Sequence, residues 1–205
     1  WFISDTKMKL GVPKIFKKFT LNFKYNDPIG LEKIINKNKN KISCLIMEAS
    51  NIIHPEFLDG KKNIMNGKFN YFTEKNIFKK RYHFLKFVEK ICKKNNIVFI
   101  LDEMITGFRW ALGGAQEFYN INPDISTFGK AMANGYSVSA VVGKRKFMEL
   151  GSIEKKGNKR LFLLSSTHGS EMNSLAAMIA TIDFIKSKSV IPKIWDYGNK
   201  LIKKF

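Results

Sequence analysis

The heptapeptide IVFILDE, at residues 97–103, decides the fold. It is a short apolar run rich in β-branched residues that ends in two acids, which is typical of a strand buried on both faces. The preceding residues 77–96 have the period of an amphipathic helix with Lys on its outer face. Its apolar stripe consists of Phe84, Leu85, Phe87, Val88, Ile91 and Cys92. A helix that leads into a buried strand indicates an α/β architecture.

The same alternation continues on both sides of this stretch. We predict further strands at 42–48, 123–130, 137–143 and 161–170, and further helices at 29–41, 114–120, 144–150, 173–188 and 191–205. Residues 49–75 have no sustained period and are interrupted by Gly and Asn, so we interpret them as a long excursion or insertion. The pattern predicts an α/β fold with a mainly parallel sheet flanked by helices.

The charge of the chain is unusual. Its 205 residues carry a formal net charge of +19. The excess is nearly all Lys, scattered among Asn, Ile and Phe, whereas proteins that read phosphates and base edges favour the bidentate Arg side chain. We therefore expect no nucleic-acid partner. No apolar run approaches about 18 residues, so we expect no membrane span either.

The sequence offers no metal site and no disulfide framework. Cys44 and Cys92 stand in apolar or amphipathic contexts without a CxxC motif, so we expect two buried free thiols in a reducing cytoplasm. No set of His, Cys and acidic residues has metal-ligand spacing. We expect His83 to be structural and His54, before Pro55, to be exposed.

Two predicted strands end in candidate reactive groups. Asp102 follows IVFIL, and Lys130 follows DISTF. Ligands of parallel sheets bind at the carboxyl ends of the strands. An aldehyde cofactor needs an amine that holds it as a Schiff base, and a pyridine ring stays protonated at nitrogen when a carboxylate faces it. Gly129, Ala131 and Ala133 leave room for a planar ligand beside Lys130.

A third element is the hydroxyl-rich turn SSTHGS at residues 165–170. It lies just ahead of the helix predicted from Asn173, where hydroxyls and free N–H groups make a phosphate clasp. The alternative is a simple N-cap, in which Ser170 or Asn173 accepts the first helical N–H groups. His168 fits either a place near a phosphate or an ordinary turn.

Several motifs together resemble one family. LDEMITGFR, GAQEFYNINPDISTFGKAMANG and GKRKFME are similar, in this order, to the class III pyridoxal-phosphate aminotransferases, and most of all to the glutamate-1-semialdehyde aminomutase group and its aminotransferase relatives. The Asp-to-Lys separation, 130 − 102 = 28, agrees with the family. The resemblance covers residues 1–48 and 77–205, while residues 49–76 are longer and less similar.

The resemblance implies a pyridoxal-phosphate-dependent transferase of fold type I. Residues 1–172 correspond to part of the large cofactor-binding domain, with an insertion near 49–76. Residues 173–205 correspond to helices leading toward a small C-terminal domain that is cut short. The family binds pyridoxal 5'-phosphate and moves an amino group between a small-molecule donor and a carbonyl acceptor.

The resemblance also assigns roles to single residues. Lys130 holds the cofactor as a Schiff base and then shuttles a proton, and Asp102 pairs with the pyridinium nitrogen. Met104 takes the place of an apolar side chain on one ring face. Thr167 matches a Thr that reaches the cofactor phosphate of the neighbouring subunit, which implies a homodimer with shared active sites. The resemblance gives Glu103 and Arg109 structural or supporting roles.

The sequence also departs from the family. Glu48-Ala49 stands where the family has Glu-Pro, and AMANGYSVSA replaces a Gly-rich run with Pro that is typical of the aminomutases. The second departure favours a transaminase, with a glutamate-1-semialdehyde 2,1-aminomutase as the alternative. The family's Ser-Gly phosphate loop has no counterpart upstream, so we expect a fragment of a longer enzyme. A non-catalytic remnant of the same fold is the other alternative.

Overall fold

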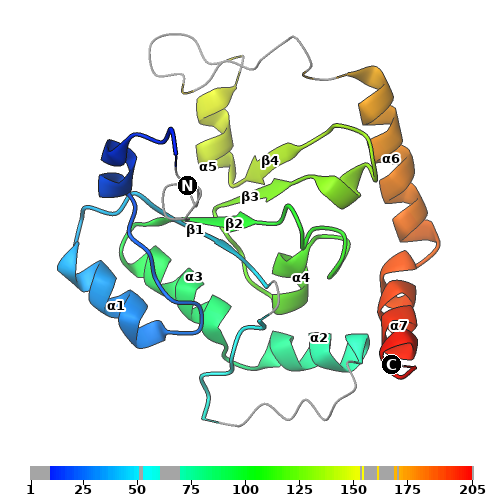
Figure 1. Ribbon diagram of the computed structural model, residues 1–205, viewed down its shortest axis with the longest axis horizontal. Coiled ribbons are helices and arrows are strands. Elements are labelled where there is room, and N and C mark those ends of the chain that lie inside the picture. The colour runs from blue at the N-terminus through cyan, green and yellow to red at the C-terminus, as the bar shows by residue number, and fades with distance from the viewer. Residues whose placement is uncertain are drawn as a thin grey trace.

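A computed structural model of the chain describes residues 10–50, 53–60, 70–152, 154, 161, 169 and 171–204. Its sheet has the strand order β1-β2-β3-β4 (Figure 1), and the strands are β1 (Cys44–Glu48), β2 (Val98–Asp102), β3 (Ile125–Phe128) and β4 (Ala140–Gly143). The first three strands are parallel, and β4 is antiparallel to β3. The predicted α/β fold with a mainly parallel sheet is confirmed.

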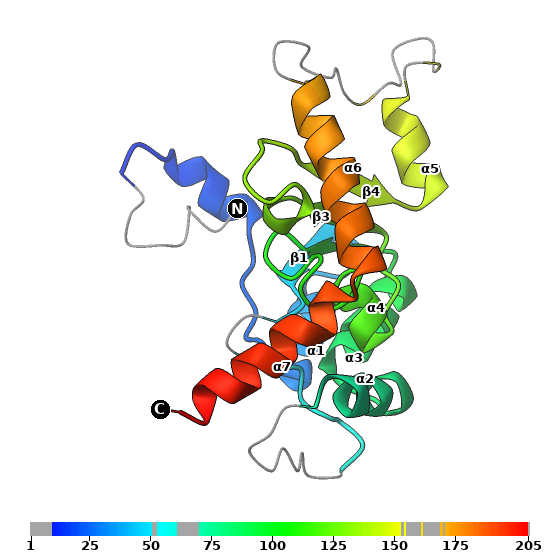
Figure 2. The same cartoon turned by 90° about the vertical axis from the view of Figure 1, so that its right-hand side faces the viewer.

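The described helices surround this sheet. The α-helices are α1 (Pro28–Lys37), α2 (Tyr71–Lys80), α3 (Phe84–Lys94), α4 (Ala115–Tyr119), α5 (Arg145–Met148), α6 (Met172–Ser187) and α7 (Val190–Ile202). Short 3-10 turns are η2 (Lys14–Phe19), η3 (Lys130–Met132) and η4 (Glu149–Gly151). Figure 2 shows α6 and α7 following one another along the side of the molecule that faces the viewer.

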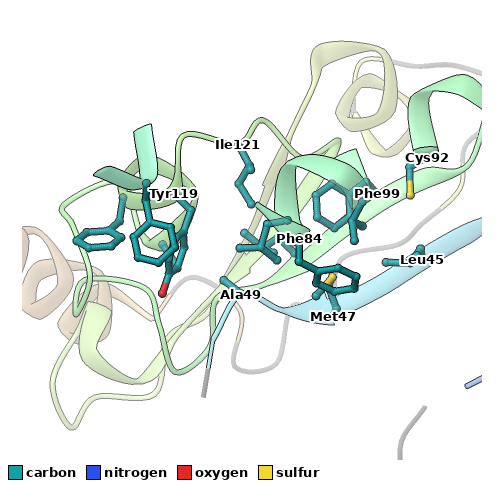
Figure 3. Close-up of a cluster of buried hydrophobic side chains, with 14 of the residues drawn as sticks. Leu45, Met47, Ala49, Phe84, Cys92, Phe99, Tyr119 and Ile121 are labelled. Atoms are coloured by element: carbon teal, nitrogen blue, oxygen red, sulfur yellow. The ribbon is translucent and has the colours of Figure 1, made fainter. Parts of the chain in front are cut away.

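The core lies between α3 and the parallel strands. The apolar stripe of α3 is buried as predicted, except that Phe87 is only partly buried against the cluster. It packs with side chains of β1 and β2, among them Leu45, Met47 and Phe99 (Figure 3). Burying each such side chain contributes about 1.5–3 kcal/mol, so this layer fixes the position of β2 and of the residues at its carboxyl end.

The helix predicted over residues 77–96 is wrong in its extent. The chain instead forms α2 and α3, with Arg81 in an extended conformation between them. The first of these helices begins at Tyr71, inside the range that we interpreted as irregular, and Asn70 caps it by accepting a hydrogen bond from the Thr73 N–H at 3.0 Å.

Backbone contacts with a distant segment explain the break. The Leu58 N–H donates to the Tyr82 carbonyl at 2.8 Å, and the Phe84 N–H donates to the Glu56 carbonyl at 2.9 Å. His83, between these two contacts, is fully buried and its Nε2 lies 2.9 Å from the Tyr119 carbonyl oxygen. These bonds replace the helical ones, and His83 is structural as expected.

Two smaller expectations are also wrong. Cys44 is exposed because it begins β1 at the rim of the sheet, whereas Cys92 is buried; both thiols are free. His54 is half-buried instead of exposed, since its Nδ1 lies 3.2 Å from the Tyr119 hydroxyl and its ring packs edge-on against Trp110. Burial lowers the pKa of His54.

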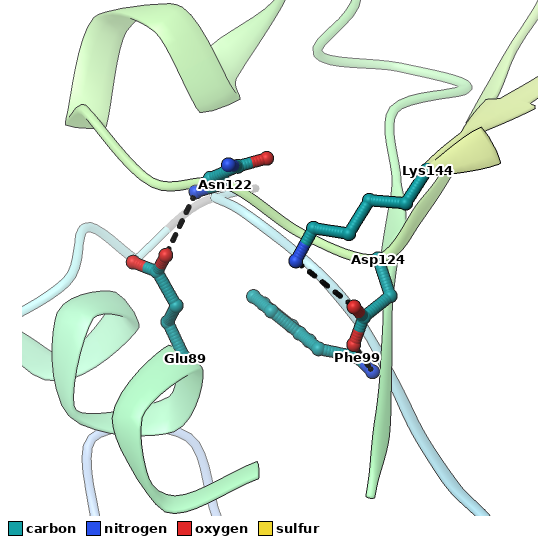
Figure 4. Close-up of polar contacts among 5 residues, drawn as sticks. All are labelled: Glu89, Phe99, Asn122, Asp124 and Lys144. Carbon is teal, nitrogen blue, oxygen red and sulfur yellow. Dashed lines mark hydrogen bonds and ion pairs between the residues drawn. The ribbon is translucent and has the colours of Figure 1, made fainter. Parts of the chain in front are cut away.

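A polar cluster ties the amino-terminal end of the sheet together (Figure 4). Asp124 accepts hydrogen bonds from the Phe99 N–H and from the Lys144 ammonium, both at 2.9 Å. Nearby, the Asn122 N–H donates to Glu89 at 3.3 Å. Asp124 thereby joins β2, β3 and the end of β4, so the opposite, carboxyl end of the sheet is held in a defined register.

Candidate active site

Two of the predicted site residues end neighbouring strands. Asp102 is the last residue of β2 and pairs in register with Thr127 of β3. Lys130 follows three residues after Thr127, where β3 gives way to the η3 turn. Because β2 and β3 are parallel, their carboxyl ends meet at one edge of the sheet, and the structure places Asp102 and Lys130 at that edge.

The Asp102 carboxylate is held by one of its two oxygens. Oδ1 accepts a hydrogen bond from the Met104 N–H at 3.0 Å and another from the Thr127 hydroxyl at 3.2 Å. Within the described part of the chain, Oδ2 has no hydrogen-bond partner. The side chain is half-buried, so this carboxylate is fixed in orientation and keeps one oxygen for a ligand.

Lys130 stands in a strained backbone conformation. Its φ is +44°, in the left-handed region that a side chain with a Cβ seldom adopts. The residue is exposed, and its ammonium makes no hydrogen bond or ion pair with any residue that the structure describes. Strain of this kind costs about 1–3 kcal/mol and is concentrated at functional sites.

Met104 lies against the residue that precedes Lys130. A Cβ added to Gly129 would fall 2.4 Å from Met104 Cε and 3.1 Å from Sδ, so only a glycine admits this packing without a shift. The φ of Gly129 is −174°, an ordinary extended value, so a Cβ at this position would require only that the Met104 side chain move. Asp102, Met104 and Lys130 thus share one end of the sheet.

Glu103 anchors the loop that follows Asp102. Its side chain is fully buried and accepts hydrogen bonds from the Ala115 and Gln116 N–H groups, both at 2.8 Å, and from the Thr106 hydroxyl. Burial raises the pKa of Glu103, and these hydrogen bonds oppose that rise. Glu103 caps the start of α4, so it has the structural role that we expected.

The second motif residue with an expected supporting role is Arg109. Its side chain is exposed, and its carbonyl accepts a hydrogen bond from the Trp195 indole N–H of α7 at 2.9 Å. Trp195 also packs on Trp110, with ring centroids 4.7 Å apart. Helix α7 is therefore fastened to the loop that begins at Asp102.

Thr167 and His168 lie outside the described residues, as does most of the strand predicted over 161–170. The phosphate clasp therefore stays a prediction. A cavity of about 590 Å³ lies between residues 137–139 and the start of α6, where Glu171, Ser174 and Leu175 line it. Helix α6 also contacts η3, the turn that begins at Lys130.

Sequence reasoning missed Thr127 as a site residue. Thr is common in strands, and nothing in DISTFGK distinguishes its hydroxyl from that of Ser126. The signal is the alternation of the strand combined with the register of its neighbour: position 127 is opposite Asp102. The left-handed backbone of Lys130 carries no signal in the sequence.

No group of three or more His, Cys, Asp or Glu residues among the described residues is placed to hold a metal ion. None of the helices described is both long enough and apolar enough to cross a membrane.

Comparison with known proteins adds a family and a fold. The sequence model of the family "Aminotransferase class-III" matches residues 74–205. A glutamate-1-semialdehyde 2,1-aminomutase of Methanococcoides burtonii is 32% identical over 94% of this chain and 39% of its own length. The chain therefore spans about two fifths of the length of this relative.

Two solved structures are similar in fold. One is described as a transaminase with PLP bound, with a TM-score of 0.66 and 20% identity over 86% of this chain and 36% of that one. The other, an omega-transaminase from Sphaerobacter thermophilus, has a TM-score of 0.65 and 18% identity over 86% and 35%. These likenesses confirm the expected fold of the pyridoxal-phosphate-dependent transferases of type I.

Proposed function

Because the chain belongs to the class-III aminotransferase family, we propose that the protein is a transaminase that uses pyridoxal 5'-phosphate. It would move an amino group between a small-molecule amino donor and an aldehyde or ketone acceptor. The observation that carries this proposal is the meeting of Asp102 and Lys130 at the carboxyl edge of the sheet.

The residues at this edge fit the cofactor. Lys130 offers an amine with no partner in the described part of the chain, and Asp102 offers one carboxylate oxygen whose mate is already held by two donors. Met104 packs on Gly129, the residue before Lys130, and would offer an apolar side chain to the cofactor ring. The site thus offers an amine for the aldehyde, a carboxylate for the pyridine nitrogen and an apolar side chain for the ring face.

Bound pyridoxal phosphate supplies an aldehyde that condenses with amines and a ring that draws electrons from the carbon bearing the amino group. Lys130 Nζ would be the amine that holds the cofactor. Once released, the same Nζ would accept a proton from the substrate and give it back. Its place on an exposed turn lets the side chain move between these two tasks.

Asp102 and Met104 set the position and charge of the ring. The Asp102 carboxylate, in a half-buried setting, favours a protonated pyridine nitrogen through opposite charge. Met104 would offer the ring a soft, polarizable thioether, which adapts to a flat aromatic surface. The Met104 N–H donates to Asp102 Oδ1, so the backbone at Met104 helps to orient the Asp102 carboxylate.

The wider assembly follows from the same resemblance. Thr167 would bind the cofactor phosphate of the neighbouring subunit, so the active unit would be a homodimer with shared sites. Residues 1–172 would belong to the large domain and residues 173–205 would lead toward the small one. The two free thiols, Cys44 and Cys92, suit a cytoplasmic protein.

A second candidate is a glutamate-1-semialdehyde 2,1-aminomutase. The observation that favours it is the name of the relative at 32% identity, which covers nearly all of this chain. The two reactions differ in the number of substrates that they require. An aminomutase converts one substrate by itself, whereas a transaminase needs a separate amino donor and a separate carbonyl acceptor.

The test is an assay of the protein, in the longest form that its gene encodes, with pyridoxal phosphate. Conversion that requires both an amino donor and a carbonyl compound supports the transaminase. Conversion of glutamate-1-semialdehyde alone supports the aminomutase. If neither reaction exceeds that of a Lys130→Ala control, the protein is a non-catalytic remnant of the fold and the proposal fails.

A further inference from the structure

Thr127 contacts the carboxylate that the proposed reaction depends on. It lies opposite Asp102 on the neighbouring parallel strand, and its hydroxyl donates to Asp102 Oδ1 at 3.2 Å. Its own backbone is engaged in the ladder, since the Thr127 carbonyl accepts the Glu103 N–H at 2.9 Å. The hydroxyl is therefore presented from a rigid strand.

Both hydrogen bonds to Asp102 fall on the same oxygen. The Met104 N–H reaches Oδ1 from within the same loop, at 3.0 Å, and the Thr127 hydroxyl reaches it from across the sheet. One donor alone would leave the carboxylate free to rotate about its terminal torsion, which is soft in Asp. Two donors from different elements fix its plane and leave Oδ2 for the ligand.

We propose that Thr127 is a positioning residue for the proposed reaction: its hydroxyl holds Asp102 Oδ1 so that Oδ2 faces the pyridinium nitrogen of bound pyridoxal phosphate. The inference rests on the proposed function and deepens it. Strand formation alone does not require the hydroxyl, because Val is β-branched as well and suits a strand at least as well as Thr.

The neighbouring hydroxyl supplies a matched control. Ser126 belongs to the same strand but points to the other face, where its hydroxyl donates to Gln116 Oε1 at 3.1 Å. Ser126→Ala therefore removes a buried hydroxyl from β3 without touching Asp102. Any effect common to both positions reports on the strand, and an effect confined to position 127 reports on the carboxylate.

The experiment compares the wild-type protein with Thr127→Val, Thr127→Ser and Ser126→Ala. Three quantities are measured: the affinity for pyridoxal phosphate, the visible absorption spectrum of the bound cofactor, and the melting temperature without cofactor. A hydrogen bond to a charged group is among the stronger ones. We expect Thr127→Val to weaken cofactor binding about tenfold and to alter the spectrum, whereas Thr127→Ser and Ser126→Ala bind within about threefold of wild type.

The outcomes separate the two claims. Wild-type affinity and spectrum in Thr127→Val, or a loss in Thr127→Ser equal to that in Thr127→Val, overturns the inference alone. A wild-type protein that binds no pyridoxal phosphate overturns the proposed function together with the inference. If Thr127→Val does not fold, Thr127→Ala takes its place against Thr127→Ser, with the same expected loss and the same rescue by the serine hydroxyl.

Discussion

At the scale of single residues, Lys130 holds a backbone conformation that works against the stability of the protein. Its φ of +44° costs a residue with a Cβ about 1 kcal/mol or more, whereas glycine adopts it freely. The proposed role of Lys130 gives a reason for this cost, because it requires an amine at the end of β3. A conformation of this kind is stored strain at a site, and it has a measurable consequence.

We predict that Lys130→Gly is more stable than Lys130→Ala. Both changes remove the amine, but only glycine also removes the strain, so the difference in the free energy of unfolding should be about 1 kcal/mol in favour of glycine. Urea unfolding without cofactor measures it. Equal stability, or a more stable alanine variant, would show that position 130 is not strained.

At the scale of elements, the loop from Asp102 to α4 depends on one buried carboxylate. Glu103 satisfies two backbone N–H groups at the start of α4 and the Thr106 hydroxyl. Gly114 has a φ of +84°, and a Cβ there would lie 2.6 Å from Glu103 Oε1. The loop is thus built around this carboxylate, with no room for a larger residue beside it.

Glu103→Ala should lower the free energy of unfolding by about 3 kcal/mol. The change leaves donors at the start of α4 without any other hydrogen-bond acceptor in the described structure. Chemical denaturation gives this value. The matched control is Glu149→Ala, which removes an exposed carboxylate paired with Arg145 and should change stability by less than about 0.5 kcal/mol. Similar losses in the two variants would contradict the capping role.

The polar cluster at the other end of the sheet predicts a pH dependence. Burial alone would raise the pKa of Asp124, but the Phe99 N–H and the Lys144 ammonium together lower it below its ordinary value of 3.8. A lowered folded-state pKa contributes stability that is fully present above the unfolded-state pKa. This contribution is lost as the pH falls through the folded-state pKa.

Asp124→Asn should therefore be less stable than wild type at pH 7, by about 1 kcal/mol. The difference should shrink as the pH falls below the ordinary value of 3.8, because the unfolded chain then takes up a proton that the folded state still excludes. Thermal unfolding at a series of pH values measures this. Asp196→Asn, which removes an exposed pair with Lys200, is the control and should track wild type throughout. A difference that is independent of pH would contradict the charge-based account.

The sequence predicts elements well where period and burial agree. Strands β1, β2 and β3 and helices α1 and α6 follow from apolar runs and helical spacing. The positions of Asp102 and Lys130 at strand ends follow from β2 and β3. The break at His83 could not be predicted, because backbone hydrogen bonds from residues 56–58 impose it. Thr127 was missed for a related reason: its role depends on the register of two strands and not on its own neighbours in sequence.

At the scale of the whole molecule, large apolar side chains are exposed on several elements. Those on β4, α6 and α7 include Val141, Met172, Ile179, Phe184 and Ile202. Exposed apolar side chains that gather on a surface favour association with another surface. The net charge of +19 opposes association of the chains at low salt.

The isolated 205-residue chain should therefore self-associate, and more strongly at high salt. Salt screens the repulsion between like-charged chains while the apolar surfaces stay exposed. Light scattering at about 0.05 M and 0.5 M salt, which spans Debye lengths from above to well below 10 Å, checks this. A monomer at both salt concentrations would contradict the prediction.

The central claim is that Lys130 holds pyridoxal phosphate covalently. The most direct measurement is to load the protein with the cofactor, reduce it with borohydride and locate the modified lysine by peptide mass spectrometry. The account predicts that the label is on Lys130 and that the cofactor-dependent labelling disappears in Lys130→Ala. Label spread over the many surface lysines, or unchanged in Lys130→Ala, would contradict it.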